Sequence, residues 1–130
     1  VRHAVEVAGE DRAHITRWLS KRVGYKLIVP DLSNLDLKLV GGRLLPGSTG
    51  AAAFYMYESP SGERFTMYCA YAHTPEMSLR YREASDRIGA FYWADKEVAF
   101  VVSGAADRAK LEKITKAIYD QVEKANVHKL

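Results

Sequence analysis

The most reactive side chains in this sequence are a single cysteine and four histidines: Cys69, His3, His14, His73 and His128. A zinc site needs three or four converging ligands, normally supplied in closely spaced pairs, and no two of these residues have such spacing. No serine lies in a Gly-x-Ser-x-Gly turn, and Cys69 is in no recognised nucleophile motif. We therefore expect no catalytic residue, no metal site and no cofactor.

Two further features invite a chemical interpretation that their surroundings do not support. Gly41 and Gly42, followed by Gly47, lack the lysine and the serine or threonine that complete a phosphate-binding loop. We expect them to mark a bulge or bend in a long strand and a turn after it. Cys69 lies in an alternating stretch, which predicts a buried thiol opposite Ala52 with a raised pKa.

Two segments have the apolar spacing of helices, and these must flank whatever site the chain forms. In residues 10–23, Ile15, Trp18 and Leu19 recur at helical spacing, and Gly24 is placed to end the helix. A second helix is predicted after Asp107, which can cap its first turn. Its apolar stripe consists of Leu111, Ile114, Thr115, Ile118, Tyr119 and Val122.

Between the helices the apolar residues recur with a period of two, which predicts antiparallel strands. A four-residue loop over 59–62 places Phe54 opposite Met67. A tight loop over 95–96 places Trp93 opposite Val98; this loop lacks glycine, and an even shift of register would keep the same faces. The buried face then carries Phe54, Met56, Phe65, Met67, Cys69, Phe91, Trp93, Val98, Phe100 and Val102.

These elements predict one α+β domain over residues 1–130. We expect an antiparallel sheet of about five to seven strands, with the N-terminal and the C-terminal helix packed on one face. In the expected registers the other face carries four tyrosines, Tyr55, Tyr57, Tyr68 and Tyr92. Because tyrosine buries a large area at low entropic cost, this face is a candidate for binding a protein partner or a second copy, unless water or a loop covers it.

An alternative use of the aromatic residues is a ligand pocket between the sheet and the helices. Its walls would be Trp18, Phe91, Trp93 and Tyr119. The two hypotheses differ in one structural feature, because a ligand-binding domain needs a deep pocket with converging polar groups and a protein-binding face does not.

Charge and hydropathy exclude several other classes of protein. Lysine and arginine number 19 and aspartate and glutamate 16, which gives a formal charge of +3. The basic residues are spread along the chain rather than clustered, so we expect no nucleic-acid partner. No apolar run is long enough to span a membrane. The chain starts with Val1, which suggests a fragment of a longer protein.

Several short strings carry a family resemblance that covers most of the chain. They are Arg17 to Gly24, Pro30 to Pro46, Phe54 to Tyr68 with its Met56-Tyr57-Glu58, Phe91-Tyr92-Trp93, and Val102-Ser103-Gly104-Ala105 with the helix after Asp107. These segments resemble the extracytoplasmic part of the transmembrane anti-sigma factors of Gram-negative bacteria. The matching strings are not catalytic motifs, and no binding residue is carried over from the family.

The resemblance implies a non-enzymatic regulatory role. In that family a cytoplasmic N-terminal part holds an extracytoplasmic-function sigma factor, a transmembrane helix follows, and a periplasmic domain comes last. This chain would be the periplasmic domain of an inner-membrane protein, tethered through a helix that the sequence does not include. It would sense an envelope signal directly or through a protein partner. The alternative is a ligand-binding or protein-interaction domain without a link to a sigma factor.

Overall fold

The computed structural model describes residues 7–8, 12–47, 50–72, 75–83, 85, 87–105, 107–125 and 128–129. In chain order the elements are β1 (Val7–Ala8), α1 (Arg12–Val23), β2 (Tyr25–Lys26), the 3-10 helix η1 (Ser33–Leu35), β3 (Lys38–Gly47), β4 (Gly50–Glu58), β5 (Arg64–Tyr71), β6 (Met77–Glu83), β7 (Gly89–Asp95), β8 (Val98–Gly104), α2 (Arg108–Ala125) and β9 (His128–Lys129).

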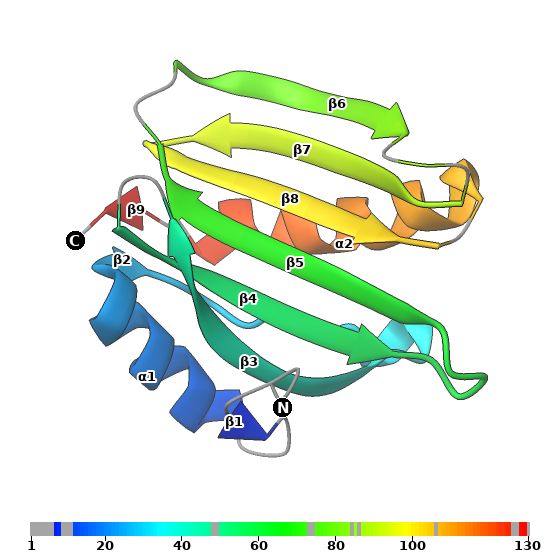
Figure 1. The fold of residues 1–130 in the computed structure, drawn as a ribbon, viewed down its shortest axis with the longest axis horizontal. Coiled ribbons are helices and arrows are strands. Elements are labelled where there is room, and N and C mark those ends of the chain that lie inside the picture. The colour runs from blue at the N-terminus through cyan, green and yellow to red at the C-terminus, as the bar shows by residue number, and fades with distance from the viewer. Residues whose placement is uncertain are drawn as a thin grey trace.

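The strands form one antiparallel sheet of seven in the order β1-β3-β4-β5-β8-β7-β6, and β2 pairs separately with β9. Helix α1 packs beneath β3 and β4, and α2 lies along β7 and β8 on the same side of the sheet (Figure 1). The α+β class, the strand number and the placement of both helices on one face are confirmed. One layer of helices therefore covers one face of a single sheet.

The end of α1 and the start of α2 are as the sequence predicts, whereas α1 is described from Arg12 and its predicted start at residue 10 lies outside the described residues. Gly24 terminates α1 with φ of 81°, and its N–H donates to the carbonyl of Ser20 at 3.0 Å. Asp107 caps α2 by accepting a hydrogen bond from the backbone N–H of Lys110 at 2.8 Å. The buried stripe of α2 consists of Leu111, Ile114, Thr115, Ile118 and Val122. Tyr119 packs beside it, partly buried.

The segment between β2 and β3 completes the helical layer. Leu27, Val29 and Leu32 are buried in the core. The hydroxyl of Tyr57 donates to the carbonyl of Pro30 at 2.7 Å, and the side-chain amide of Gln121 makes two hydrogen bonds of 2.8 Å with the backbone of Asp31. These bonds tie the segment to both the sheet and α2.

The predicted register of the β4–β5 hairpin is wrong by one residue. Tyr55 pairs with Met67 and Tyr57 with Phe65, where we expected Phe54 and Met56. The loop is three residues long, from Pro60 to Gly62, and Ser59 opposes Glu63 through a 2.9 Å backbone hydrogen bond. Because side chains alternate along a strand, this slip exchanges the two faces of β4.

The β7–β8 hairpin is shifted by two residues from the expected register, so its faces are as predicted. Trp93 pairs with Phe100 and Phe91 with Val102. The turn residues Lys96 and Glu97 both have positive φ, 51° and 66°, the conformation of a two-residue turn that matches the twist of a hairpin. The bulge expected at the glycines of β3 is also present, since the register with β4 shifts between Leu39 and Gly41.

Candidate functional site on the open face of the sheet

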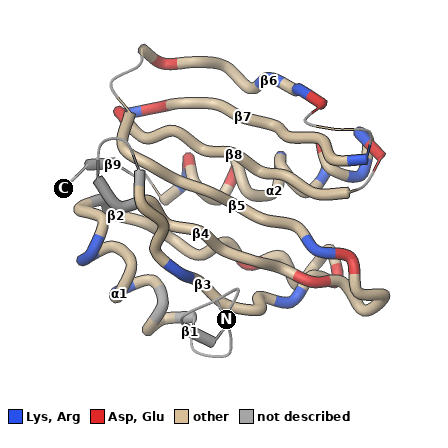
Figure 2. The backbone as a smooth tube through the Cα atoms, in the orientation of Figure 1, with Lys and Arg blue, Asp and Glu red and all other residues tan. Residues whose placement is uncertain are grey.

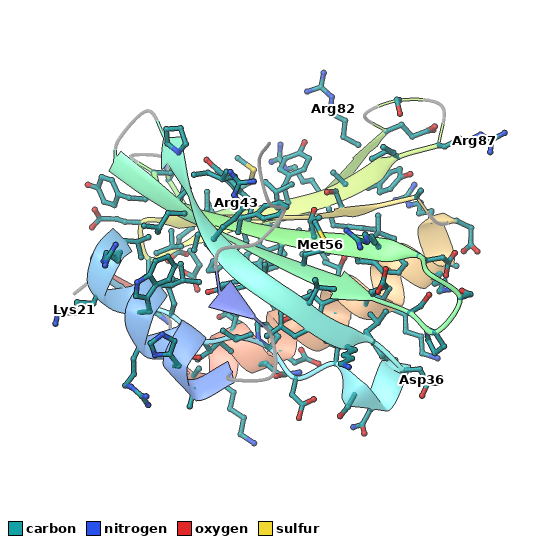
Figure 3. All side chains as sticks on the ribbon, turned by 60° about the horizontal axis from the view of Figure 1, so that its bottom comes forward. Lys21, Asp36, Arg43, Met56, Arg82 and Arg87 are labelled. Atoms are coloured by element: carbon teal, nitrogen blue, oxygen red, sulfur yellow. The ribbon has the colours of Figure 1, made fainter. Side chains whose placement is uncertain are left out.

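The side of the sheet away from the helices is not covered by any described element. We call it the open face and define it by Arg43, Phe54, Met56, Tyr68, Tyr92 and Val101. Figure 3 shows Arg43, Met56 and Arg82 on this side, opposite α1 and α2. The large apolar side chains of the open face are half-buried, whereas those of the core face, such as Phe65 and Phe100, are 1% exposed.

Strand pairing aligns six large side chains of the open face into one row that crosses the sheet. Arg43 lies opposite Phe54, Phe54 opposite Tyr68, and Tyr68 opposite Val101. The row continues from Val101 to Tyr92 and ends at Arg80 on β6. With neighbouring strands about 4.8 Å apart, this aromatic row spans about 24 Å. It presents aromatic and aliphatic surface between an arginine at each end.

Smaller side chains flank the aromatic row on both sides. On one side Ala94 pairs with Ala99, and Ala99 with Ala70. On the other side Thr66 and Ser103 are directly opposed, and their hydroxyls share a hydrogen bond of 2.7 Å. Since that polar pair is already satisfied, a partner could cover it without leaving an unpaired hydroxyl. The aromatic row therefore stands as a ridge with smaller side chains on both sides of it on β5, β7 and β8.

A hollow of about 480 Å³ lies beside the ridge, where β6, β7 and β8 run together. It is lined by Arg82, Glu83, Ala90, Tyr92 and Val101. Ala90 lies opposite Arg82 on one neighbouring strand and Ser103 on the other, and its small side chain leaves the space that Tyr92 and Arg82 border. The hollow is large enough to accept a side chain of a binding partner.

The open face is basic. By strand pairing Arg43, Arg64, Arg80 and Arg82 lie on it with Glu58, and Glu83 lines the hollow beside Arg82. Figure 2 shows basic positions on β3, β5 and β6. Arg64 is neutralised by Glu58 at 3.1 Å. A partner with acidic side chains is therefore electrostatically favoured on this face.

Two of the four tyrosines predicted for the partner face lie elsewhere. Tyr68 and Tyr92 are on the open face, but Tyr55 and Tyr57 are 0% and 1% exposed and belong to the core. The one-residue slip of β4 is the reason, and it brings Phe54 and Met56 to the open face in their place. Phe54 and Met56 were predicted for the buried face, and Arg43 for neither face, yet all three lie on the open face.

The aromatic residues of the alternative pocket are packed in the core or against it. Trp93 stacks on Phe100 at 4.9 Å, and the ring of Tyr119 meets it edge-on at 5.4 Å. Phe91 is 4% exposed in the same core, whereas Trp18 lies on α1 with the guanidinium of Arg22 5.0 Å from its ring. These four residues are packing residues. The hollow of the open face is lined by other residues.

Metal-binding groups are not brought together in the part of the chain that the structure describes, which contains no cluster of three or more His, Cys, Asp or Glu side chains able to hold an ion. His14 is exposed on α1. His3 and His73 lie outside the described residues, and the side chain of His128 is not described.

Cys69 is fully buried opposite Ala53, one residue from the expected Ala52. Burial raises the pKa of Cys69 to about 12, and the neighbouring Tyr55 hydroxyl offsets only part of the rise.

At pH 8 we expect iodoacetamide to label the native protein at Cys69 at least about 100-fold more slowly than the protein unfolded in urea, because the thiolate is the reacting form. As a control, Ala70→Cys in a Cys69→Ala background places a thiol on the open face and should label rapidly. Equal labelling rates for the two thiols would contradict the buried placement.

Acidic side chains lie close together near the C-terminal part of α2. The pKa of Glu123 is raised, first by burial, then by a hydrogen bond with Asp95 and by the charges of Asp95 and Glu76, while Lys96 opposes the rise. Burial, followed by the charges of Glu123 and Asp95, also raises the pKa of Tyr119. Ionised Glu123 is therefore unfavourable in the folded protein.

We expect Glu123→Gln to stabilise the protein at neutral pH by up to about 1 kcal/mol, the range for partly exposed charge interactions. The folded state holds the Glu123 proton more tightly than the unfolded state, so stability falls as pH rises from the ordinary glutamate pKa to the raised one. The gain should thus disappear near pH 3.5. Thermal unfolding at pH 3.5 and 7 measures it. Glu112→Gln, which removes the 3.5 Å pair with Lys116, should bring no gain at pH 7; a gain for both variants would show that the effect is not specific to the surroundings of Glu123.

No described helix is long and apolar enough to cross a membrane. Comparisons of the chain with protein-family models, with curated proteins and with solved structures return no match.

Proposed function

We propose that this chain is the non-enzymatic, periplasmic regulatory domain of a membrane-anchored anti-sigma factor, and that it binds a protein partner through its open face. The regulatory role rests on the resemblance of segments such as Pro30 to Pro46 to that family. The sigma factor would be held by a cytoplasmic part outside this sequence, and a transmembrane helix would tether the domain. The binding role rests on the geometry of the open face.

The observation that carries the binding role is the aromatic row. Tyrosine, phenylalanine and arginine are enriched at the centres of protein interfaces, and the two aromatic residues bury much area for few lost side-chain rotations. The row places Phe54 next to Tyr68, and Tyr92 beyond Val101, on a rigid sheet. Half-buried rings on a fixed backbone need little ordering on binding, so covering them costs little side-chain entropy.

A partner of different charge fits the open face better than a second copy of the chain. Two copies that meet through their open faces would bring the arginines at the ends of both rows, Arg43 and Arg80, into one interface. Like charges brought together in an interface cost free energy, whereas acidic side chains across from them gain it. We therefore expect the domain to be monomeric and its partner to be acidic where it covers the row.

The regulatory proposal is tested in the bacterium that encodes the protein, with the full-length gene. Deleting the gene should raise transcription severalfold from a set of promoters that share one alternative sigma factor, measured by RNA sequencing. Unchanged transcription after deletion would overturn the link to a sigma factor.

The binding proposal is tested with Tyr68→Ser/Tyr92→Ser in the full-length protein. This variant should change how the same promoters respond to envelope stress without lowering the amount of protein. The control is Lys21→Ser/Lys113→Ser, since both lysines are exposed on the helices, away from the open face. An unaltered response in the tyrosine variant would remove the open face from the regulatory function.

The hollow beside Tyr92 favours a second candidate function, binding of a small anionic ligand without a link to a sigma factor. Its volume of about 480 Å³ lies in the range of ligand sites, and Arg82 supplies a cation at its rim beside the carboxylate of Glu83. A ligand of this kind would raise the unfolding temperature in a saturable way, and Arg82→Gln would abolish the rise. A panel of small carboxylates and phosphates without any saturable rise would remove this candidate.

A further inference from the structure

Strand β6 is a long free edge of the sheet. It is the last of the seven strands, it pairs with β7 on one side, and no described element pairs with its other side (Figure 1). The opposite end of the sheet is different, because β3 is paired there with the two-residue strand β1 and packs against α1. A strand edge with unpaired N–H and C=O groups is a template for another strand.

The sequence of β6 leaves this edge able to pair. The strand from Met77 to Glu83 contains no proline and no glycine, the residues that would remove a donor or weaken the strand. A bulge interrupts its pairing with β7 only between Met77 and Arg80, so residues 80–83 are regular. Leu79 and Tyr81 are packed against the core, which holds the strand in place.

Two of the exposed side chains of β6 are basic, Arg80 and Arg82, and the other exposed residues of the strand are Ser78 and Glu83. Arg80 and Arg82 are exposed, and by their pairing with Tyr92 and Ala90 they lie on the open face. Neither arginine has an ion pair with another described residue. Edge charges normally discourage pairing with an identical strand, but they favour a strand of opposite charge, because directly opposed cross-strand charges are close.

We infer that β6 binds an extended acidic segment of the protein partner by strand addition, with carboxylates of that segment beside Arg80 and Arg82. This inference rests on the proposed binding function and specifies its partner. Side chains of the added strand that point to the open-face side of the sheet lie opposite the two arginines. The added strand runs antiparallel or parallel to β6, about 4.8 Å from it.

The hollow and the aromatic row extend the same contact. The hollow begins at Arg82 and continues over Ala90 to Val101, so chain that follows the added strand can place a side chain in it. From there the aromatic row leads across the open face to Arg43. A second copy of this chain is a poor occupant, because pairing two β6 strands with both open faces on one side sets arginine against arginine.

The test uses the 130-residue chain and a fluorescein-labelled eight-residue peptide in which glutamate alternates with threonine and valine. Fluorescence anisotropy at low salt should show saturable binding, weakened at high ionic strength. Arg80→Glu/Arg82→Glu should weaken binding about tenfold or more, since two opposed ion pairs become repulsive. A peptide with lysine in place of glutamate, and a glutamate peptide methylated on alternate backbone nitrogens, should bind at least about tenfold more weakly.

The matched control is Lys21→Glu/Lys113→Glu, which changes the net charge by the same amount at exposed positions on the helices. It should leave peptide affinity within about twofold of the native value. Amide hydrogen exchange should show new protection on β6 when the glutamate peptide is bound.

The inference is overturned if the peptide does not bind, if the methylated peptide binds equally well, or if the protection falls on another strand. It is also overturned if light scattering shows that the chain alone is a dimer in which β6 is already protected from hydrogen exchange. None of these results decides the proposed function, which the promoter measurements with the Tyr68 and Tyr92 variants test separately.

Discussion

Replacing Trp93 with alanine should lower the free energy of unfolding by about 3–5 kcal/mol, a large part of the total for a domain of this size. Trp93 is 2% exposed, stacks on Phe100 and meets Tyr119 from α2. It therefore joins the sheet to the helix, and its loss leaves a cavity between two layers. Urea unfolding followed by far-ultraviolet circular dichroism measures the change without relying on tryptophan fluorescence.

Two neighbouring variants make the result specific. Trp93→Phe keeps the aromatic stack and removes an indole N–H that has no acceptor among the described residues, so it should cost much less, about 1 kcal/mol. Tyr92→Ala, one residue away on the open face, should also cost about 1 kcal/mol or less. If Tyr92→Ala proved as destabilising as Trp93→Ala, the assignment of the two faces of β7 would be wrong.

The helices and the fold class could be predicted because their signals are local. The apolar stripe of α2, the cap at Asp107 and the left-handed Gly24 each depend on a few neighbouring residues. Placing both helices on one face of an antiparallel sheet follows from the need to bury their stripes. The β7–β8 hairpin had the wrong register but the right faces, because the shift was even.

The register predicted for the β4–β5 hairpin was wrong because both faces of β4 are apolar. Phe54 and Met56 alternate with Tyr55 and Tyr57, so hydrophobicity does not choose between the two registers. The loop did contain the deciding signal. Pro60 suits the second position of a type I turn, and Gly62, with φ of 92°, suits the left-handed residue that follows in a three-residue loop. Such a loop opposes Ser59 with Glu63 and buries the tyrosines.

The wrong loop length predicted between β4 and β5 also prevented prediction of the aromatic row. With β4 slipped by one residue, the line of side chains from Arg43 through Phe54 and Tyr68 to Arg80 is broken at β4. The aromatic row depends on five strand pairings at once, so it follows from the sequence only when every register is right. Surface features that cross a sheet are therefore harder to predict than the core beneath them, where any face of sufficient apolar area satisfies the packing.

A second large effect is expected where two glycines oppose each other. Gly89 and Gly104 are paired across β7 and β8, and an aromatic ring lies against each. A Cβ at Gly104 would lie 2.4 Å from Cδ1 and 2.9 Å from Cε1 of Phe65, a ring that is 1% exposed. Because that ring is enclosed, Gly104→Ala should force it or the backbone to move and lower the free energy of unfolding by about 2–3 kcal/mol.

Gly89→Ala is the matched comparison, because its Cβ would lie 2.5 Å from the hydroxyl of Tyr81. Tyr81 is half-buried on the edge strand β6, and its ring can swing away at the cost of its contacts with Phe91 and Arg108. This variant should therefore cost about 1 kcal/mol or less. Combining Gly104→Ala with Phe65→Leu should cost at least about 1 kcal/mol less than the sum of the single variants, since the shorter side chain relieves the clash. Additive costs in urea unfolding would show that Phe65 does not occupy the space above Gly104.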